Sequence, residues 1–381
     1  MRITKGLMKR RVKGIAALLF ILITSASTQR LLAQTSETAT PVSQVGVDIP
    51  RSQLQKLRSS IDGQEYALYV YTPPGYYSDA TKTFPVLYLL DAQWDFPLVV
   101  GLFESQWEDG FVPPMIIVGI TWGGQNPNYG YLRFKDLTPT NNPRFPQSGN
   151  GPNFLSFMKK ELIPFIDTNY HTVKNDRILM GNSLGGTFGL YALFSEPGLF
   201  NRFILSSPNL TFGKGMAVYE KEYAAKSSAL PVRLFICVGE LEGSHITQDQ
   251  EFASTLRARH YQGLDFETLI VKGTGHSSNK PEGFVKGLQA VFAPGPLAIA
   301  PSILDQYVGK YQLQEIVRER DQLFLIIPEG TRFLLNPQSE RDFYVRGFYM
   351  IIHFKSNDAG KVTGFEMEQA SGNRQFVEKT K

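Results

Sequence analysis

The sequence contains short, almost wholly apolar runs that alternate with longer segments of helical spacing. Such runs are typical of strands buried on both faces, as in parallel sheets covered by helices. The alternation therefore predicts an α/β fold with a mainly parallel sheet. The apolar runs are FPVLYLLDAQ, PPMIIVGIT and DRILMG. Three more strands are predicted at FNRFILSSP, LPVRLFICVG and LDFETLIVKG, and the helical segments include NFLSFMKKELIPFIDTNY, TFGLYALFSEPGLF, DQEFASTLRARHYQG and PEGFVKGLQAVF.

The alternation stops at residues 294–302, where the Pro- and Ala-rich segment PGPLAIAPS predicts a linker. No helical spacing follows it. We therefore expect an α/β domain over residues 48–293 and a small antiparallel β domain over residues 303–381. The strand candidates of the second domain are YVGKYQL, LFLIIP, TRFLLNP, DFYVRG, YMIIHFK and VTGFEMEQ.

Residues 1–34 have the order of segments found in a secretory signal peptide. The basic stretch MRITKGLMKRRVK precedes the apolar core GIAALLFILITSAS and the small-residue region of TQRLLAQT. The core is shorter than the about 20 residues of a membrane-spanning helix. We therefore expect a cleaved signal, a polar linker at residues 35–47, and a secreted or periplasmic mature chain without a membrane span. An uncleaved N-terminal anchor is the alternative.

Loss of the first 34 residues would reverse the sign of the net charge. The whole chain has 39 basic and 35 acidic residues, and the first 34 positions hold seven of the basic ones and no acidic one. The remainder has 32 basic and 35 acidic residues, a net charge of −3. This charge offers no electrostatic reason to expect nucleic-acid binding.

The stretch RILMGNSLGG places Ser183 in a G-x-S-x-G motif between a predicted strand and a predicted helix. This motif occurs by chance in many chains, but a strand–turn–helix setting is the one that a nucleophile elbow requires. The tight turn needs small neighbours, and we expect a side chain at Gly181 or Gly185 to clash as strand and helix close together. The alternative is an ordinary strand–helix turn.

The same turn predicts where an oxyanion would be stabilised. The amide of Leu184, at the start of the helix, can face the developing negative charge. A second donor is expected from the loop after PVLYLLD, through the backbone amide of Ala92 or Gln93. Asp91 comes too early in the chain order to be the catalytic acid, so we interpret it as a structural carboxylate.

His276 is the candidate general base. It follows the last strand of the α/β region, and loops at the carboxyl ends of parallel strands form the active sites of such sheets. Gly273 and Gly275 would let its loop fold over the nucleophile. The other histidines fit less well: His171 precedes the serine, and His245, His260 and His353 are expected in a surface loop, after a surface helix and in a C-terminal strand.

Two glutamates compete for the role of the acid. Glu240 and Glu242 both follow the strand LFICVG directly, and either carboxylate could orient His276.

A metal site of Glu242 and His245 is conceivable, but two ligands are weak evidence, so we expect no metal and no organic cofactor. Cys237 lies inside the same apolar strand and is expected to be buried and unreactive.

Seven segments together resemble the putative esterase family of α/β hydrolases, over about residues 50–293. In order they are FPVLYLLDAQ, KDLTPT, FLSFMKKELIPFIDTNY, MGNSLGG, FILSSP, VGELE and GTGH. That family includes siderophore esterases, esterase D-like enzymes, feruloyl and acetylxylan esterases, and mycolyltransferases. The resemblance favours Glu242, the third residue after Gly239, over Glu240.

The resemblance also bears on substrate binding. Family members often carry an Arg-x-Arg-Asp run before LTPT, where this chain has Arg133 and then Lys135. Arg133 is therefore a candidate substrate-binding residue. Trp122 is a second candidate, because it belongs to the aromatic-rich segment TWGGQNPNYGYLRF, whose rings could line an acyl or catechol pocket or simply pack. The C-terminal segment resembles the small lipocalin-like β domain appended to many secreted serine hydrolases, which implies an accessory role.

Together these features predict a secreted serine esterase with a Ser-His-Glu triad and an acyl-enzyme intermediate. The expected substrate is a small-molecule or carbohydrate ester, such as a siderophore or an acylated sugar. An acyltransferase on the same scaffold is one alternative, and a catalytically dead hydrolase-fold binding protein is another. No oligomeric state is predicted.

Overall fold

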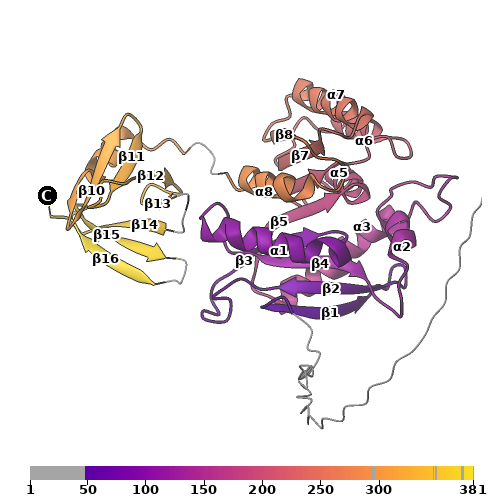
Figure 1. The fold of residues 1–381 in the computed structure, drawn as a ribbon, viewed down its shortest axis with the longest axis horizontal. Coiled ribbons are helices and arrows are strands. Elements are labelled where there is room, and N and C mark those ends of the chain that lie inside the picture. Colours follow the sequence, from indigo (N-terminus) through magenta and orange to yellow (C-terminus); the bar gives the residue numbers. More distant parts are fainter. Residues whose placement is uncertain (1–47, 294–296, 346, 348–349, 370–372, 381) are drawn as a thin grey trace, which may run out of the picture. The chain divides into compact units, whose positions relative to one another are not determined.

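The computed structural model describes residues 48–293, 297–345, 347, 350–369 and 373–380. The predicted signal peptide and the linker at residues 35–47 lie outside the described residues. Two eight-stranded sheets are present within them (Figure 1). The first is mainly parallel and carries the helices, which confirms the predicted α/β class, and the second is antiparallel.

The strands of the first sheet are β1 (Ser52–Arg58), β2 (Glu65–Tyr71), β3 (Phe84–Leu89), β4 (Ile116–Trp122), β5 (Thr172–Asn182), β6 (Arg202–Ser206), β7 (Arg233–Gly239) and β8 (Asp265–Val271). The associated helices are α1 (Ala92–Glu108), α2 (Tyr129–Asp136), α3 (Gly151–Phe157), α4 (Ile163–Asn169), α5 (Leu184–Ser195), α6 (Met216–Ala224), α7 (Ser244–Arg259) and α8 (Lys280–Val291). A π-helical turn, Met158–Leu162, joins α3 to α4.

The strand order is β1-β2-β4-β3-β5-β6-β7-β8. β1 and β2 run antiparallel to their neighbours, and β3 to β8 pair in parallel. The carboxyl ends of the parallel strands therefore meet at one edge of the sheet. The loops that follow β3, β5, β6, β7 and β8 come together there, and they carry the candidate site.

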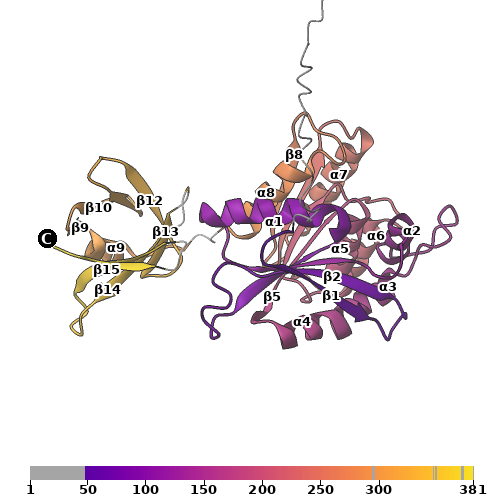
Figure 2. The same ribbon diagram turned by 60° about the horizontal axis from the view of Figure 1, so that its bottom comes forward.

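Alternate residues of the central strands enter two separate cores, because successive side chains point to opposite faces of a sheet. In β3, Val86 and Tyr88 belong to the core shared with α3, α4 and α5, whereas Leu87 and Leu89 belong to the core shared with α1 and α8 (Figure 2). All four side chains are fully buried. A strand covered on both faces must be apolar at every position, which explains the continuous apolar runs in the sequence.

The second sheet is an up-and-down meander of β9 (Gly309–Tyr311), β10 (Gln314–Glu319), β11 (Gln322–Ile326), β12 (Arg332–Pro337), β13 (Asp342–Val345), β14 (Met350–Ser356), β15 (Val362–Gln369) and β16 (Arg374–Glu378). A bridge between Tyr311 and Lys379 joins its first and last strands into a barrel-like closure. The interior is filled by aromatic side chains, including Tyr307 stacked on Phe354 with ring centroids 3.8 Å apart. Side-chain packing of this kind is expected for a small barrel.

Two expectations for the C-terminal region are corrected. A short helix, α9 (Pro301–Tyr307), begins inside the predicted linker, although no helix was expected after it. Pro301 suits the first helical position, where its fixed φ is favourable and its missing N–H is not needed. The strands β10 and β16 were also not predicted, since QEIVRE and RQFVE carry too many charges to resemble buried runs.

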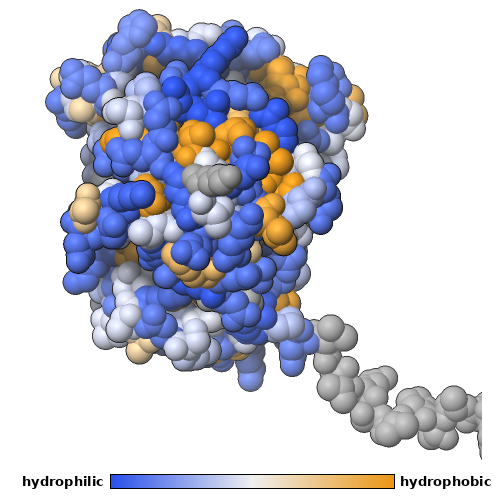
Figure 3. All heavy atoms as spheres, turned by 90° about the vertical axis from the view of Figure 1, so that its left-hand side faces the viewer, coloured by the Kyte–Doolittle hydropathy of each residue, from blue (hydrophilic) through white to orange (hydrophobic). Residues whose placement is uncertain are grey.

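The outer face of the C-terminal region carries apolar side chains among polar ones. Figure 3 shows such a group on the side of the molecule that lies at the left of Figure 1. The large apolar residues exposed in this part of the chain include Val308, Leu313 and Phe376, of which Leu313 is 82% exposed. Scattered exposed apolar residues are ordinary on protein surfaces, so these alone indicate no binding partner.

Two helical glycines allow a matched test of the packing. A Cβ on Gly287 of α8 would lie 2.4 Å from Ile204 Cγ2 and 3.0 Å from the ring of Phe235, whereas one on Gly101 of α1 would have no neighbour within 4 Å. Gly287→Ala should lower the free energy of unfolding by about 1–3 kcal/mol through overpacking. Gly101→Ala should raise it by roughly 0.5–1 kcal/mol, because alanine loses less backbone entropy. Urea unfolding measures both, and equal effects would contradict the packing of α8 on the sheet.

Candidate active site

Ser183 occupies a strained turn between β5 and α5. Its φ of 59° and ψ of −118° lie in a region that residues with side chains rarely adopt. The backbone on both sides holds it there. The amide of Ser183 donates to the carbonyl of Ser206 at 2.9 Å, and its own carbonyl accepts from the amide and hydroxyl of Thr187 at 2.9 and 3.1 Å.

The two glycines of the motif have different roles. A Cβ on Gly181 would lie 2.7 Å from the carbonyl carbon of Gly185, so the predicted clash is confirmed at this position. The same prediction is wrong for Gly185, where a Cβ would lie no closer than 3.4 Å to Leu90, an ordinary contact. Gly185 therefore matters through its backbone, which the backbone of Gly181 approaches closely.

The predicted oxyanion donors all lie at helix N-termini. Leu184 is the first residue of α5, and Ala92 and Gln93 are the first two residues of α1. The first N–H groups of a helix have no acceptor within it and carry its partial positive charge. The two termini are neighbours, because a Cβ on Gly185 would lie 3.5 Å from Asp91 Oδ2.

Asp91, just before α1, is held by Arg133 of α2. The guanidinium binds both carboxylate oxygens, with Nε 3.0 Å from Oδ1 and Nη2 2.7 Å from Oδ2. Asp91 is 3% exposed and has a left-handed φ of 55°. This ion pair agrees with the structural role expected for Asp91. Arg133 also lies 5.6 Å from the ring centre of Trp94, whose side chain is 54% exposed.

Trp122, the other candidate for substrate binding, lies in the core instead. It is 3% exposed, and its indole Nε1 donates to Asp136 Oδ2 at 2.7 Å. Asp136 also accepts from the hydroxyl of Tyr66 at 3.0 Å. This placement argues against substrate contact, since Trp122 completes a buried polar cluster.

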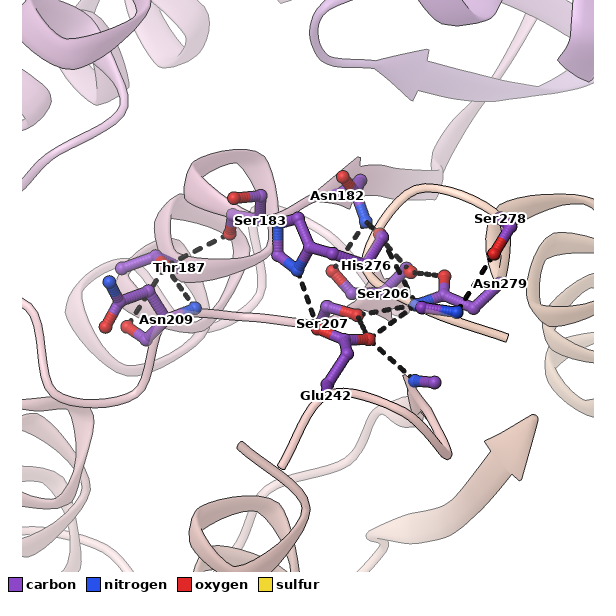
Figure 4. A network of polar contacts seen from close by, with 12 residues as sticks. Asn182, Ser183, Thr187, Ser206, Ser207, Asn209, Glu242, His276, Ser278 and Asn279 are labelled. Carbon is purple, nitrogen blue, oxygen red and sulfur yellow. Dashed lines mark hydrogen bonds and ion pairs between the residues drawn. The ribbon is translucent and has the colours of Figure 1, made fainter. Parts of the chain in front are cut away.

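His276 lies beside Ser183 in the loop between β8 and α8, and Figure 4 shows its ring between Ser183 and Glu242. Its Nδ1 is 2.6 Å from Glu242 Oε2, and 44% of its side chain remains exposed. The end of β7 makes room for this loop. A Cβ on Gly239 would lie 2.6 Å from the carbonyl oxygen of Thr274 and 2.8 Å from that of Gly275.

Glu242 is buried, with 4% of its side chain exposed, and both its oxygens are bound. Oε1 accepts from Ser207 Oγ at 2.6 Å, from the amide of Gly239 at 2.7 Å and from Asn279 Nδ2 at 2.8 Å. Burial by itself raises the pKa of Glu242. The hydrogen bonds from Ser207, His276 and Gly239 outweigh burial and hold this pKa below its ordinary value.

Glu240, the competing glutamate, points to solvent. Its carboxylate pairs with Lys272 at 2.7 Å and accepts from the amide of Gly273 at 2.9 Å. The structure therefore places Glu242, and not Glu240, against His276. The geometry agrees with the choice that the family resemblance favours.

The remaining histidines lie outside this pair. The ring of His245, in the first turn of α7, has its centre 6.1 Å from that of His276. His353 of β14 contacts Asp342 through Nδ1 at 2.7 Å, and His171 stacks on Tyr76. Within the described ranges, no three His, Cys, Asp or Glu side chains converge in a way that could hold a metal ion.

Cys237 is buried inside β7, as predicted. Burial raises the pKa of its thiol to about 12. The thiol is therefore un-ionised at neutral pH and is a poor nucleophile.

A buried polar network that the sequence did not reveal supports the pair. Asn279 is fully buried, and its amide donates to Ser207 Oγ at 2.7 Å and to Glu242. Ser206 Oγ donates to Asn279 Oδ1 at 2.6 Å and accepts from Asn182 Nδ2 at 3.0 Å. A small polar pair at a strand end, in FILSSP, and an asparagine three positions after His276 are the only signals that could have indicated this network.

Comparisons with known proteins show the family of this chain. The family model described as "Putative esterase" matches residues 59–264, more than half of the chain. The ferri-bacillibactin esterase BesA of Bacillus subtilis (strain 168) is 27% identical over 272 residues, which are 65% of this chain and 92% of BesA.

Two solved structures are similar to this chain in fold. The BES protein from Bacillus cereus aligns with a TM-score of 0.59 and 27% identity, covering 66% of this chain and 98% of its own. An IroE-like serine hydrolase from Shewanella oneidensis aligns with a TM-score of 0.57 and 26% identity, covering 67% and 85%.

Ser207→Ala should reveal how Glu242 is kept ionised. Loss of the Ser207 hydroxyl should lower the free energy of unfolding by about 1–3 kcal/mol at pH 7, since a hydrogen bond to the buried carboxylate of Glu242 is removed. Because the pKa of Glu242 is lower in the folded protein than in the unfolded chain, this stabilisation is present above the unfolded pKa and is lost as the pH falls through the folded pKa. The difference from wild type should therefore shrink on acidification.

Urea unfolding between neutral and acidic pH measures this difference. Ser254→Ala is the control, because Ser254 is on the exposed face of α7 and bonds only its own helix at Gln250. A Ser207→Ala difference that stays constant with pH would contradict the role of this hydroxyl in holding the Glu242 charge.

Proposed function

Because this chain belongs to the putative esterase family, we propose that it is a serine hydrolase of carboxylic esters, with Ser183, His276 and Glu242 as its catalytic triad. The observation that carries this proposal is the hydrogen-bonded pair of His276 and Glu242 beside a serine held in a strained turn. An ordinary strand–helix turn needs neither the strain nor the pair. The order along the chain, serine, acid and then histidine, is that of α/β hydrolases.

The first step is acylation of Ser183. As Oγ attacks the ester carbonyl carbon, Nε2 of His276 takes the hydroxyl proton, and Glu242 stabilises the imidazolium through Nδ1–H. The carbonyl oxygen becomes an oxyanion, which the amides of Leu184 and of Ala92 or Gln93 stabilise. Collapse of the tetrahedral intermediate breaks the ester bond, and His276 gives its proton to the leaving alcohol.

The second step hydrolyses the acyl-enzyme. Water gives a proton to His276 Nε2 and attacks the acyl carbonyl, and a second oxyanion forms at the same amides. Collapse of this intermediate breaks the bond to Ser183 Oγ, which takes the proton back from His276. The products are the free acid and the original enzyme, so the cycle needs no cofactor.

The substrate class that we propose is a siderophore ester. The name of the Bacillus subtilis relative, ferri-bacillibactin esterase, supports this class. Trp94, in the first turn of α1, also fits an aromatic, anionic ligand: it is 54% exposed, and the guanidinium of Arg133 lies 5.6 Å from its ring centre. Aromatic faces bind aryl groups by stacking, and a guanidinium favours anionic oxygen.

We also propose that the enzyme acts outside the cytoplasm, as its first 34 residues predict. Those residues lie outside the described structure, so this proposal rests on the sequence. Within the described part of the chain, no helix has the length and apolarity to cross a membrane.

Turnover of p-nitrophenyl butyrate tests the chemistry. Ser183→Ala should lower kcat by roughly 10³-fold or more, because the nucleophile is removed. Glu242→Gln should lower kcat by about 10²-fold or more, because His276 loses its carboxylate partner. Glu240→Gln, the matched control, should stay within about threefold, since an exposed ion pair has little effect on other groups.

Two results would contradict the assignment. Equal turnover by wild type and Ser183→Ala would remove the serine mechanism. A larger loss for Glu240→Gln than for Glu242→Gln would make Glu240 the acid.

Trp94→Ala tests the substrate class. For a catecholate siderophore ester, KM should rise about tenfold with kcat little changed, because stacking on one aromatic ring contributes about 1 kcal/mol or more. For vinyl acetate, an ester without an aromatic ring, KM should stay nearly constant. Tyr77→Ala is the control, since Tyr77 is 82% exposed in the loop between β2 and β3. An equal rise in KM for both esters would exclude an aryl-binding role for Trp94.

A further inference from the structure

A buried ion pair joins the two helices that flank the proposed active site. Lys280 Nζ lies 2.5 Å from Asp95 Oδ1, although the residues are 185 positions apart. Their side chains are only 19% and 5% exposed. Lys280 is the first residue of α8, four positions after His276, and Asp95 is in the first turn of α1, three positions after Ala92.

The Lys280–Asp95 ion pair is not expected to contribute much to the free energy of unfolding. Lys280 places a positive charge at a helix N-terminus, where the helix dipole disfavours it. Burial raises the pKa of Asp95, the pull of Lys280 and Arg133 opposes this, and the charge of Asp91 adds to it, so the net shift is upward. Buried ion pairs often contribute little to stability, because desolvation offsets the attraction. A positional role would explain why this pair is present.

The geometry of the two helices supports a positional role. α1 and α8 lie side by side on one face of the sheet, where they share a core, and both begin at the edge that carries the site (Figures 1 and 2). The ion pair connects their first turns. At the other end of the same helix pair, Gln289 Nε2 donates to Gln106 Oε1 at 2.6 Å, a neutral contact far along both helices from the site.

We propose that the Lys280–Asp95 ion pair is a positioning contact that fixes His276 relative to the oxyanion amides at the start of α1. The inference rests on the proposed function and deepens it, because it adds two positioning residues to the triad. In the proposed mechanism the base exchanges protons with Ser183 Oγ and the leaving oxygen, while the amides bind the oxyanion. All of these oxygens are attached to one tetrahedral carbon, so both groups must be placed correctly at the same time. A small displacement of either group therefore slows the chemical step more than it weakens substrate binding.

The test is a double-mutant cycle of Lys280→Met, Asp95→Asn and the double variant. Each single variant should lower kcat for p-nitrophenyl butyrate about tenfold or more, with KM within about twofold. The double variant should be no worse than the worse single variant, because both changes break the same contact. Lys280→Arg, which keeps the charge, should recover most of kcat.

Gln289→Met is the matched control on the same pair of helices. It removes the neutral contact away from the site, so it should lower the melting temperature without lowering kcat. Single variants that keep kcat within about twofold of wild type would overturn the proposal. An equal loss of kcat in Gln289→Met would also overturn it, because general packing of α1 on α8 would then explain the effect.

A second measurement separates this inference from the proposed function. The rate at which a fluorophosphonate labels Ser183 depends on the base and the oxyanion amides, and not on which ester is the natural substrate. If siderophore esters are not hydrolysed but wild type is labelled, the substrate proposal fails, and slower labelling of Lys280→Met still supports the positioning role. If Lys280→Met does not fold, the nearly isosteric Asp95→Asn decides by the same rate.

Discussion

The backbone of Gly181 lies against that of Gly185, and the geometry of the site depends on this contact. It lets β5 turn into α5 within one residue, which forces Ser183 into its strained conformation. A second close approach of the same kind occurs at the end of β7, where Gly239 meets the carbonyls of the loop that carries His276. Ser183 and His276, the proposed nucleophile and base, are thus brought together by two close approaches of the backbone, at Gly181 and at Gly239, where a Cβ would clash.

A connected set of polar side chains lies beneath the site, and its members satisfy one another's hydrogen bonds. Asn279, itself fully buried, connects Ser206, Ser207 and Glu242, and an unpaired buried polar atom would cost about 1–3 kcal/mol. The network rigidifies the loops after β6, β7 and β8 together. It therefore holds the carboxylate of Glu242 in place, which is the preorganisation that the proposed mechanism requires.

The sequence predicts the elements with strong periodicity and the residues with strong chemistry. The buried parallel strands and the placement of His276 follow from local pattern and chain order. The role of Asn279 does not, because a buried asparagine is recognised by its partners, which come from distant segments. The prediction of substrate binding by Trp122 is wrong for a related reason. An aromatic residue at a strand end can pack in the core or bind a ligand, and only its burial in the folded chain distinguishes the two. The helix α9 was missed because a proline indicates a linker as readily as the first turn of a helix.

Three carboxylates around the site are stabilised in two different ways, two by cations and one by neutral donors, and the difference fits the proposed chemistry. Asp91 and Asp95 each have a cation, Arg133 and Lys280, so their fields are largely cancelled. Glu242 is held by neutral donors instead, and its charge stays uncompensated until His276 takes a proton. A lysine or arginine in place of those donors would stabilise Glu242 equally well, but it would remove the field that stabilises the imidazolium. With cations on Asp91 and Asp95 and neutral donors on Glu242, the proposed mechanism leaves the charge of Glu242 to stabilise the imidazolium of His276.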